Sequence, residues 1–134
     1  MSSLPPEDNK LVTLAKAARA RSHLEEAGLD DLVDVREGDA LETLKEVHDD
    51  VDVLLIDGAW SLYLPVLKLI EPKLAQGAVV LGENAFDKDY IDYVRDPVNG
   101  YVSMPLPVNE GRGNEFTVRA AARSAASSPA VVRS

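Results

Sequence analysis

The chain has 134 residues, enough for one domain with a modest core, and its 46% hydrophobic and 28% charged residues are typical of a globular protein. Its net charge of -9 argues against a nucleic-acid surface, which needs clustered Lys and Arg. The absence of Cys excludes disulfides and thiolate metal sites. With no apolar run of membrane-spanning length and no signal peptide in view, we expect a cytoplasmic protein without a membrane or nucleic-acid partner.

The first predicted element is a long helix over residues 6–27. Good helix formers fill it, and Gly28 follows as a typical C-terminal stop. Its apolar positions at helical spacing are Leu11, Leu14, Ala15, Ala18 and Leu24. Residues 32–37 then alternate apolar and polar side chains, which predicts a short strand. The two histidines, His23 and His48, stand in polar surroundings and are interpreted as surface residues.

The middle of the chain alternates strands and helices, and its end is predicted to form a hairpin. The predicted helices are 40–47, 62–74 and 87–96, the last with Asp87 as its cap. The predicted strands are 51–58, 77–85, 100–108 and 115–120, with a turn over 109–114. The run at 51–58 is apolar enough to be covered on both faces. This order predicts an α/β fold with parallel inner strands, a C-terminal antiparallel hairpin and helices on both faces.

Polar residues follow three of these strands. They are Gly38-Asp39-Ala40, Asp57-Gly58 and Glu83-Asn84. Parallel strands place their carboxyl ends at one edge of a sheet, where ligands bind. Two carboxylates and an amide oxygen suit a hard divalent cation such as Mg²⁺. Any one of these residues alone is as well explained as a helix cap or a turn former.

At these residues the chain resembles the class I S-adenosylmethionine-dependent methyltransferases, and within them the catechol O-methyltransferase-like group. The most specific match is Asp57 followed six residues later by Tyr63-Leu64-Pro65, joined by the Glu83-Asn84 pair. The stretch "EGDALETL" is common to the wider class. The resemblance extends over about residues 15 to 120, and it implies a Rossmann-like methyltransferase sheet.

The resemblance also implies roles for individual residues. Asp57, Glu83 and Asn84 fall where that group holds Mg²⁺, which draws a hydroxyl of a small substrate toward its anion. Glu83 replaces the usual Asp but keeps an oxygen ligand. Gly38, Asp39 and Ala40, together with Asp57, fall at the site of S-adenosyl-L-methionine. Trp60, Tyr63 and the turn after residue 107 are candidates for lining the acceptor side.

Two departures from the family pattern bear on activity. Trp60 stands where the group carries a lysine that acts as the general base, and an indole cannot accept a proton. Lys68 and Lys73 lie too far along the next helix to replace that lysine. No glycine-rich turn precedes Gly28, so we expect the first two strands of the family's sheet, with most of the cofactor site, to be absent.

The sequence therefore predicts an incomplete methyltransferase domain over residues 1–120 and a disordered tail over 121–134. Unpaired strand edges invite association, so we expect a homodimer or a partner chain that completes the sheet. Three hypotheses remain open on function: a metal-assisted O-methyltransferase, a non-catalytic methyltransferase remnant that binds or dimerises, and an unrelated α/β domain of the response-regulator kind that holds Mg²⁺. The last lacks a lysine at a matching late strand end.

Overall fold

A computed structural model describes residues 6–108 and 113–120 of the chain. The chain divides into two compact units, Met1–Thr43 and Leu44–Ser134, and each is taken by itself below. No helix among the described residues is long and apolar enough to cross a membrane. The predicted tail over 121–134 and most of the predicted turn, residues 109–112, lie outside the described residues.

The first unit is built on one long helix, α1 (Pro6–Ala27), which confirms the prediction to the residue. Gly28 ends it with φ of 71°, a left-handed conformation that glycine adopts without a Cβ penalty. The N–H of Gly28 donates to the carbonyl of Glu25, and that of Leu29 donates to the carbonyl of Leu24. These two bonds make a Schellman motif. A short helix, α2 (Ala40–Thr43), covers only the start of the predicted 40–47 helix.

The predicted strand over residues 32–37 is wrong, because these residues have no regular structure. A strand persists only where a neighbour satisfies its backbone groups, and the four strands of the described residues pair only with one another. Side chains bind the segment instead. Arg21 Nη2 donates to the carbonyl of Val35 at 2.9 Å, and Arg21 Nη1 pairs with Glu37 at 3.2 Å. Residues 32–37 have the alternating apolar and polar pattern of a strand, but no second strand among the described residues pairs with them.

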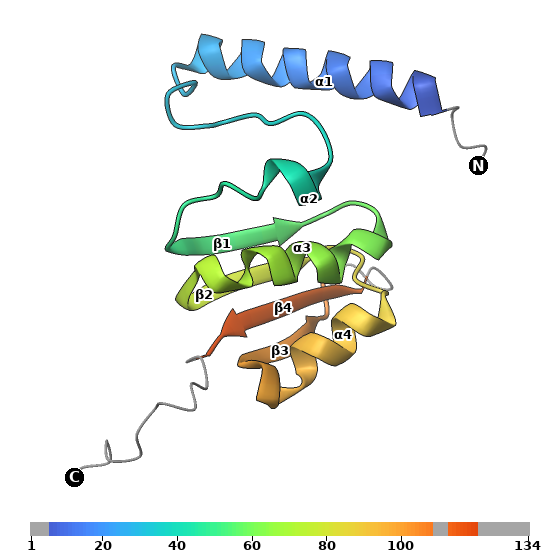
Figure 1. Cartoon of the computed structure of the whole chain (residues 1–134), viewed down its shortest axis with the longest axis vertical. Coiled ribbons are helices and arrows are strands. Elements are labelled where there is room, and N and C mark those ends of the chain that lie inside the picture. Colours follow the sequence, from blue (N-terminus) through green and yellow to red (C-terminus); the bar gives the residue numbers. More distant parts are fainter. Residues whose placement is uncertain (1–5, 109–112, 121–134) are drawn as a thin grey trace. The chain divides into compact units, whose positions relative to one another are not determined.

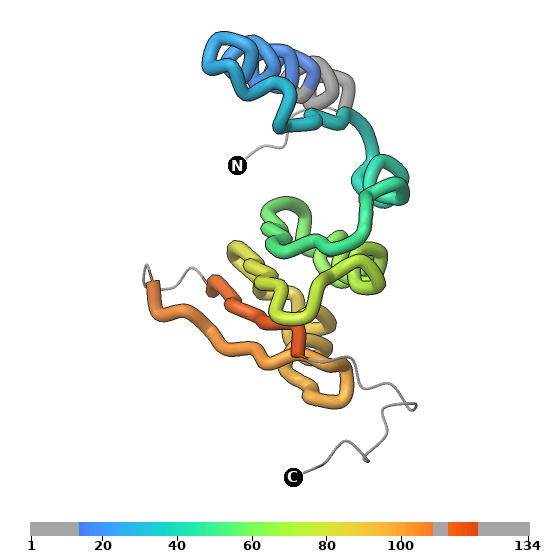
Figure 2. The backbone as a smooth tube through the Cα atoms, turned by 90° about the vertical axis from the view of Figure 1, so that its left-hand side faces the viewer, coloured from blue at the N-terminus to red at the C-terminus, as the bar shows by residue number. Residues whose placement is uncertain are grey.

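The second unit is a four-stranded sheet in the order β1-β2-β4-β3 (Figure 1). Its strands are β1 (Val51–Ile56), β2 (Leu74–Gly82), β3 (Tyr101–Leu106) and β4 (Asn114–Arg119). The β1 and β2 strands are parallel, whereas β4 runs antiparallel to both β2 and β3. Figure 2 shows β3 and β4 side by side, in orange and red. The parallel pair and the C-terminal hairpin confirm the predicted α/β class.

Two helices of this unit pack on one face of the sheet. In α3 (Tyr63–Ile70) Pro65 lies in the first turn, where its missing N–H costs no hydrogen bond. In α4 (Lys88–Arg95) the predicted cap is confirmed, because the carboxylate of Asp87 accepts from the Tyr90 N–H. The core between helices and sheet includes Ile56, Tyr63, Leu67, Val80, Tyr90 and Val94, all of them buried.

The opposite face of the sheet is apolar and exposed within this unit. Strand residues alternate between faces, so the neighbours of the buried Ile56 and Val80 point away from α3 and α4. Val53 and Leu55 on β1 are 62% and 61% exposed, and Val102 and Met104 on β3 are 68% and 56% exposed. The expectation that β1 is covered on both faces is therefore wrong for the second unit, in which helices cover one face.

Candidate functional site

The carboxyl ends of β1 and β2 lie side by side. Ile56, the last residue of β1, is in register with Gly82, the last residue of β2. The Glu83 N–H donates to the carbonyl of Ile56 at 3.0 Å, so the pairing continues one step past the strands. Asp57 and Glu83 thus follow directly on adjacent parallel strands. The structure brings these two predicted carboxylates to one edge of the sheet.

Asn84 is held in a left-handed conformation, with φ of 49°. Asparagine tolerates this region better than most residues, and neighbouring hydrogen bonds fix it here. The Asn84 N–H donates to Oδ1 of Asn114 at 3.1 Å, and the Ala85 N–H donates to the carbonyl of Gly113 at 2.8 Å. The start of β4 therefore anchors the loop that carries Glu83 and Asn84.

The chemistry of this edge fits a hard divalent cation. Asp57 is exposed, and Glu83 and Asn84 are half-buried, so all three are within reach of solvent. Carboxylate and amide oxygens are ligands that Mg²⁺ accepts, with water filling the remaining positions. No group of three or more His, Cys, Asp and Glu side chains suited to a metal occurs among the described residues. The predicted ligand set, Asp57, Glu83 and Asn84, contains two carboxylates and one amide, so it has only two side chains of those four types.

Trp60 packs with another aromatic residue at the same edge. Its ring meets that of Phe86 edge to face, with centroids 5.7 Å apart, and both residues are 52% exposed. The two lysines of this region lie elsewhere. Lys68 Nζ stands 5.0 Å above the ring of Tyr93, and Lys73 Nζ lies 3.9 Å from the carboxylate of Asp49, which precedes β1. Neither lysine takes the place of the family's base.

The predicted cofactor residues are divided between the two units. Gly38, Asp39 and Ala40 belong to the first unit, and Asp57 belongs to the second. Asp39 has a local role, because its Oδ1 accepts from the Leu41 N–H at 2.9 Å and caps α2. Because these three residues and Asp57 belong to different units, their part in cofactor binding stays a prediction.

A pocket of about 230 Å³ opens beside Glu83. Its apolar walls are Leu55, Leu81, Leu106 and Val108, and its polar groups include Glu83 and Asn114. Pockets that enclose a small molecule usually measure about 300–1,000 Å³. Leu55 of the pocket wall also belongs to the exposed sheet face.

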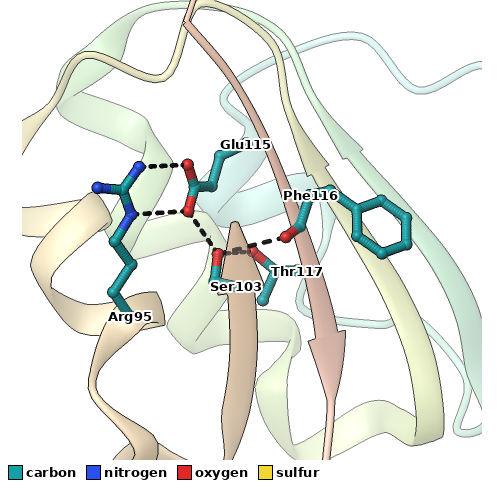
Figure 3. Close-up of polar contacts among 5 residues, drawn as sticks. All are labelled: Arg95, Ser103, Glu115, Phe116 and Thr117. Atoms are coloured by element: carbon teal, nitrogen blue, oxygen red, sulfur yellow. Dashed lines mark hydrogen bonds and ion pairs between the residues drawn. The ribbon is translucent and has the colours of Figure 1, made fainter. Parts of the chain in front are cut away.

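A buried carboxylate ties α4 to the hairpin below this edge (Figure 3). Arg95 Nε and Nη2 donate to the two oxygens of Glu115 at 2.9 and 2.7 Å, and Ser103 Oγ donates to Glu115 at 2.7 Å. Burial alone would raise the pKa of Glu115. The hydrogen bonds from Arg95 and Ser103, with the charge of Arg95, outweigh burial and lower that pKa. Glu115 is therefore a charged anchor of the scaffold.

Sequence reasoning missed the roles of two residues at this edge. The sequence motif makes Tyr63 a candidate for the acceptor side, whereas its hydroxyl contacts the loops after both β1 and β2. The sequence puts Asn114 in a turn, whereas its side chain accepts the Asn84 N–H. The Tyr63–Glu83 and Asn84–Asn114 contacts join residues 20 and 30 positions apart in the chain. The motif spacing from Asp57 to Tyr63 was the one available signal.

Comparisons with known proteins agree with this architecture. A family model described as a methyltransferase domain matches residues 3–85. An O-methyltransferase from Bacillus cereus, solved in complex with SAH, is 22% identical with a TM-score of 0.64, over 77% of this chain and 57% of that one. A putative O-methyltransferase from Klebsiella pneumoniae is 21% identical with a TM-score of 0.68, over 78% of this chain and 57% of that one.

A putative caffeoyl-CoA O-methyltransferase from Staphylococcus aureus is 21% identical with a TM-score of 0.62, over 75% of this chain and 57% of that one. No curated protein matches the sequence significantly. This chain spans 57% of the length of each of these three structures. The similarity shows that the chain shares their fold. With a family model that matches more than half of its residues, the chain belongs to the methyltransferase domain family.

Proposed function

We propose that the chain is part of a metal-assisted, S-adenosyl-L-methionine-dependent O-methyltransferase that acts on a hydroxyl of a small molecule. The observation that carries this proposal is that Asp57 and Glu83 directly follow the paired ends of adjacent strands in a methyltransferase-type sheet. Asn84, fixed in place by Asn114, adds a third oxygen to the same edge. The proposal rests on this donor set together with family membership.

In this proposal Asp57, Glu83 and Asn84 hold one Mg²⁺ through their side-chain oxygens. When bound, the cation supplies positive charge that lowers the pKa of an acceptor hydroxyl. The cofactor would supply the methyl group, whose bond to sulfur would break as its bond to the acceptor oxygen forms, with the hydroxyl proton released to solvent. The role of the chain is to orient the acceptor, which can account for much of a rate enhancement.

A second candidate function is a non-catalytic binding module. Trp60 favours this reading, because it fills the family's base position with a side chain that accepts no proton. Its ring meets that of Phe86 edge to face. Lys68 and Lys73 both contact other groups away from the edge. In this reading the edge still binds a cation, but the chain does not catalyse methyl transfer.

We further propose that a second copy of this chain covers the exposed face of the sheet. That face presents exposed apolar residues on β1 and β3, and within the described residues β1 pairs with β2 alone, leaving its other edge without a strand. Contiguous apolar patches of several hundred Å² mark interaction surfaces, and a free strand edge adds unpaired backbone groups beside one. A cytoplasmic location remains a prediction from the sequence.

Methyl transfer is tested directly with S-adenosyl-L-methionine carrying a labelled methyl group. The purified chain is incubated with Mg²⁺ and a panel of small catechol-type and other hydroxylated acceptors, and label in the acceptor is measured. The enzyme proposal predicts labelled product that disappears when EDTA removes the cation. Cofactor binding without labelled product, seen by calorimetry on the same sample, favours the non-catalytic module. A chain that binds neither cofactor nor Mg²⁺ contradicts both candidates.

A further inference from the structure

Tyr63 joins the two loops that carry the predicted metal ligands. It begins α3 and is 1% exposed. Its hydroxyl accepts a hydrogen bond from the Gly58 N–H at 3.4 Å and donates one to the carbonyl of Glu83. Gly58 directly follows Asp57. One buried hydroxyl therefore contacts the backbone on both sides of the site.

Packing of the Tyr63 ring in the core fixes the position of this hydroxyl. The ring of Tyr63 meets that of Tyr90 edge to face, with centroids 5.6 Å apart and planes at 88°. Both tyrosines are almost completely buried, so neither ring has room to change rotamer. Because its ring is fixed, the Tyr63 hydroxyl restrains the backbone groups of Gly58 and Glu83 to which it is hydrogen-bonded.

We infer that Tyr63 is a positioning residue of the proposed metal site, fixing the separation of the Asp57 and Glu83 backbones. The inference rests on the proposed function of these two carboxylates. Cation affinity depends on ligands that already stand at the right spacing, and groups that orient metal ligands typically contribute 10–100-fold to affinity. The Glu83 N–H to Ile56 carbonyl bond ties the strand ends, and the Tyr63 hydroxyl ties the loops just beyond them.

A purely structural role for Tyr63 makes a different prediction. Removing any buried hydroxyl that is hydrogen-bonded lowers stability to some degree. If that were its whole effect, the variant would melt earlier but bind a cation as the unaltered chain does. Tyr93 provides the matched comparison, because its hydroxyl donates to Glu71 at 2.8 Å and contacts neither loop.

The experiment compares the full chain with its Tyr63→Phe and Tyr93→Phe variants. Mn²⁺ serves as the probe, since it takes oxygen ligands as Mg²⁺ does, and free Mn²⁺ is measured by electron paramagnetic resonance. Hydrogen exchange of the Gly58 amide is followed by NMR, and Tm is recorded for each variant. We expect Tyr63→Phe to raise the Kd for Mn²⁺ about tenfold and to speed exchange at Gly58. Tyr93→Phe should change neither.

Equal Mn²⁺ affinity in the unaltered chain and in Tyr63→Phe overturns the inference, as does an equal loss in both variants. Unaltered chain that binds no Mn²⁺ contradicts the proposed metal site itself. In that case exchange at Gly58 still decides the role of Tyr63 in the loops. An exchange rate that Tyr63→Phe leaves unchanged overturns that role independently of any metal.

Discussion

The ring of Tyr90 packs directly on Gly82, the last residue of β2. A Cβ atom built on Gly82 would lie 3.1 Å from Cε1 of Tyr90 and 3.2 Å from its hydroxyl oxygen. The same Cβ would lie 3.1 Å from Cβ of Ala85. Tyr90 and Ala85 are both buried, so neither can move aside without disturbing the core. The end of β2 therefore requires glycine for reasons of space.

Gly82→Ala should destabilise the chain by about 1–3 kcal/mol, the usual cost of overpacking a well-packed site. Gly58→Ala is the control, since a Cβ there meets nothing within 4 Å. Urea unfolding at neutral pH gives the free energy of unfolding of each variant. A Gly82→Ala chain as stable as the Gly58→Ala chain would show that Tyr90 does not pack as described.

Arg95→Ala should destabilise the chain by about 2–4 kcal/mol, because it leaves the buried carboxylate of Glu115 without its main partner. The Glu115 side chain is 2% exposed. Lys88→Ala on the same helix is the control. Lys88 pairs with Asp92 at an exposed i,i+4 position, a kind of ion pair that contributes about 0.3–0.5 kcal/mol. Equal losses in the two variants, measured by urea unfolding, would argue against the buried ion pair.

Glu115 should also contribute to the pH dependence of stability. Its pKa in the folded chain is lowered from 4.5, so the folded state favours the charged form. Stability from this group is present above about pH 4.5 and is lost as the pH falls through the lowered pKa. Unfolding free energies at several pH values from 7 to 3 should therefore decline less steeply for Glu115→Gln than for the unaltered chain. Parallel curves would be inconsistent with this assignment.

The exposed sheet face should mediate self-association. Leu55→Glu places a charge on that face, so it should shift a dimer toward monomer in sedimentation velocity at micromolar concentrations. Val98→Glu is the control, because Val98 is 69% exposed on the 3-10 turn Pro97–Asn99, outside the strands. An unaltered chain that sediments as a monomer contradicts the proposed second copy, as does a dimer that Leu55→Glu leaves intact.

Local sequence signals were enough to place most elements of the second unit. The apolar run before Asp57 predicted β1, and Asp87 predicted the start of α4. Both features depend on neighbours in the chain. The segment 32–37 shows the limit of such signals, because an alternating pattern becomes a strand only when another strand pairs with it.

The candidate site was predictable in part, because two of its residues directly follow strands that local sequence signals predict. The register of two parallel strands puts Asp57 and Glu83 at one edge, and the strand order that produces this register follows from a helix connecting adjacent strands. The contacts of the Tyr63 hydroxyl with Glu83 and of the Glu115 carboxylate with Arg95 were not predictable, since each joins residues 20 positions apart in the chain. Such contacts depend on how the helices pack against the sheet.

The central claim is that Asp57 and Glu83 hold one divalent cation, and calorimetric titration with Mg²⁺ tests it most directly. The variants Asp57→Asn and Glu83→Gln keep side-chain size and remove one charge each, and Asp89→Asn removes an exposed charge from α4 as the control. We predict one Mg²⁺ per chain, with Kd raised at least about tenfold by each site variant and unchanged by Asp89→Asn. Equal affinity in all four proteins, or no binding by the unaltered chain, would contradict the claim.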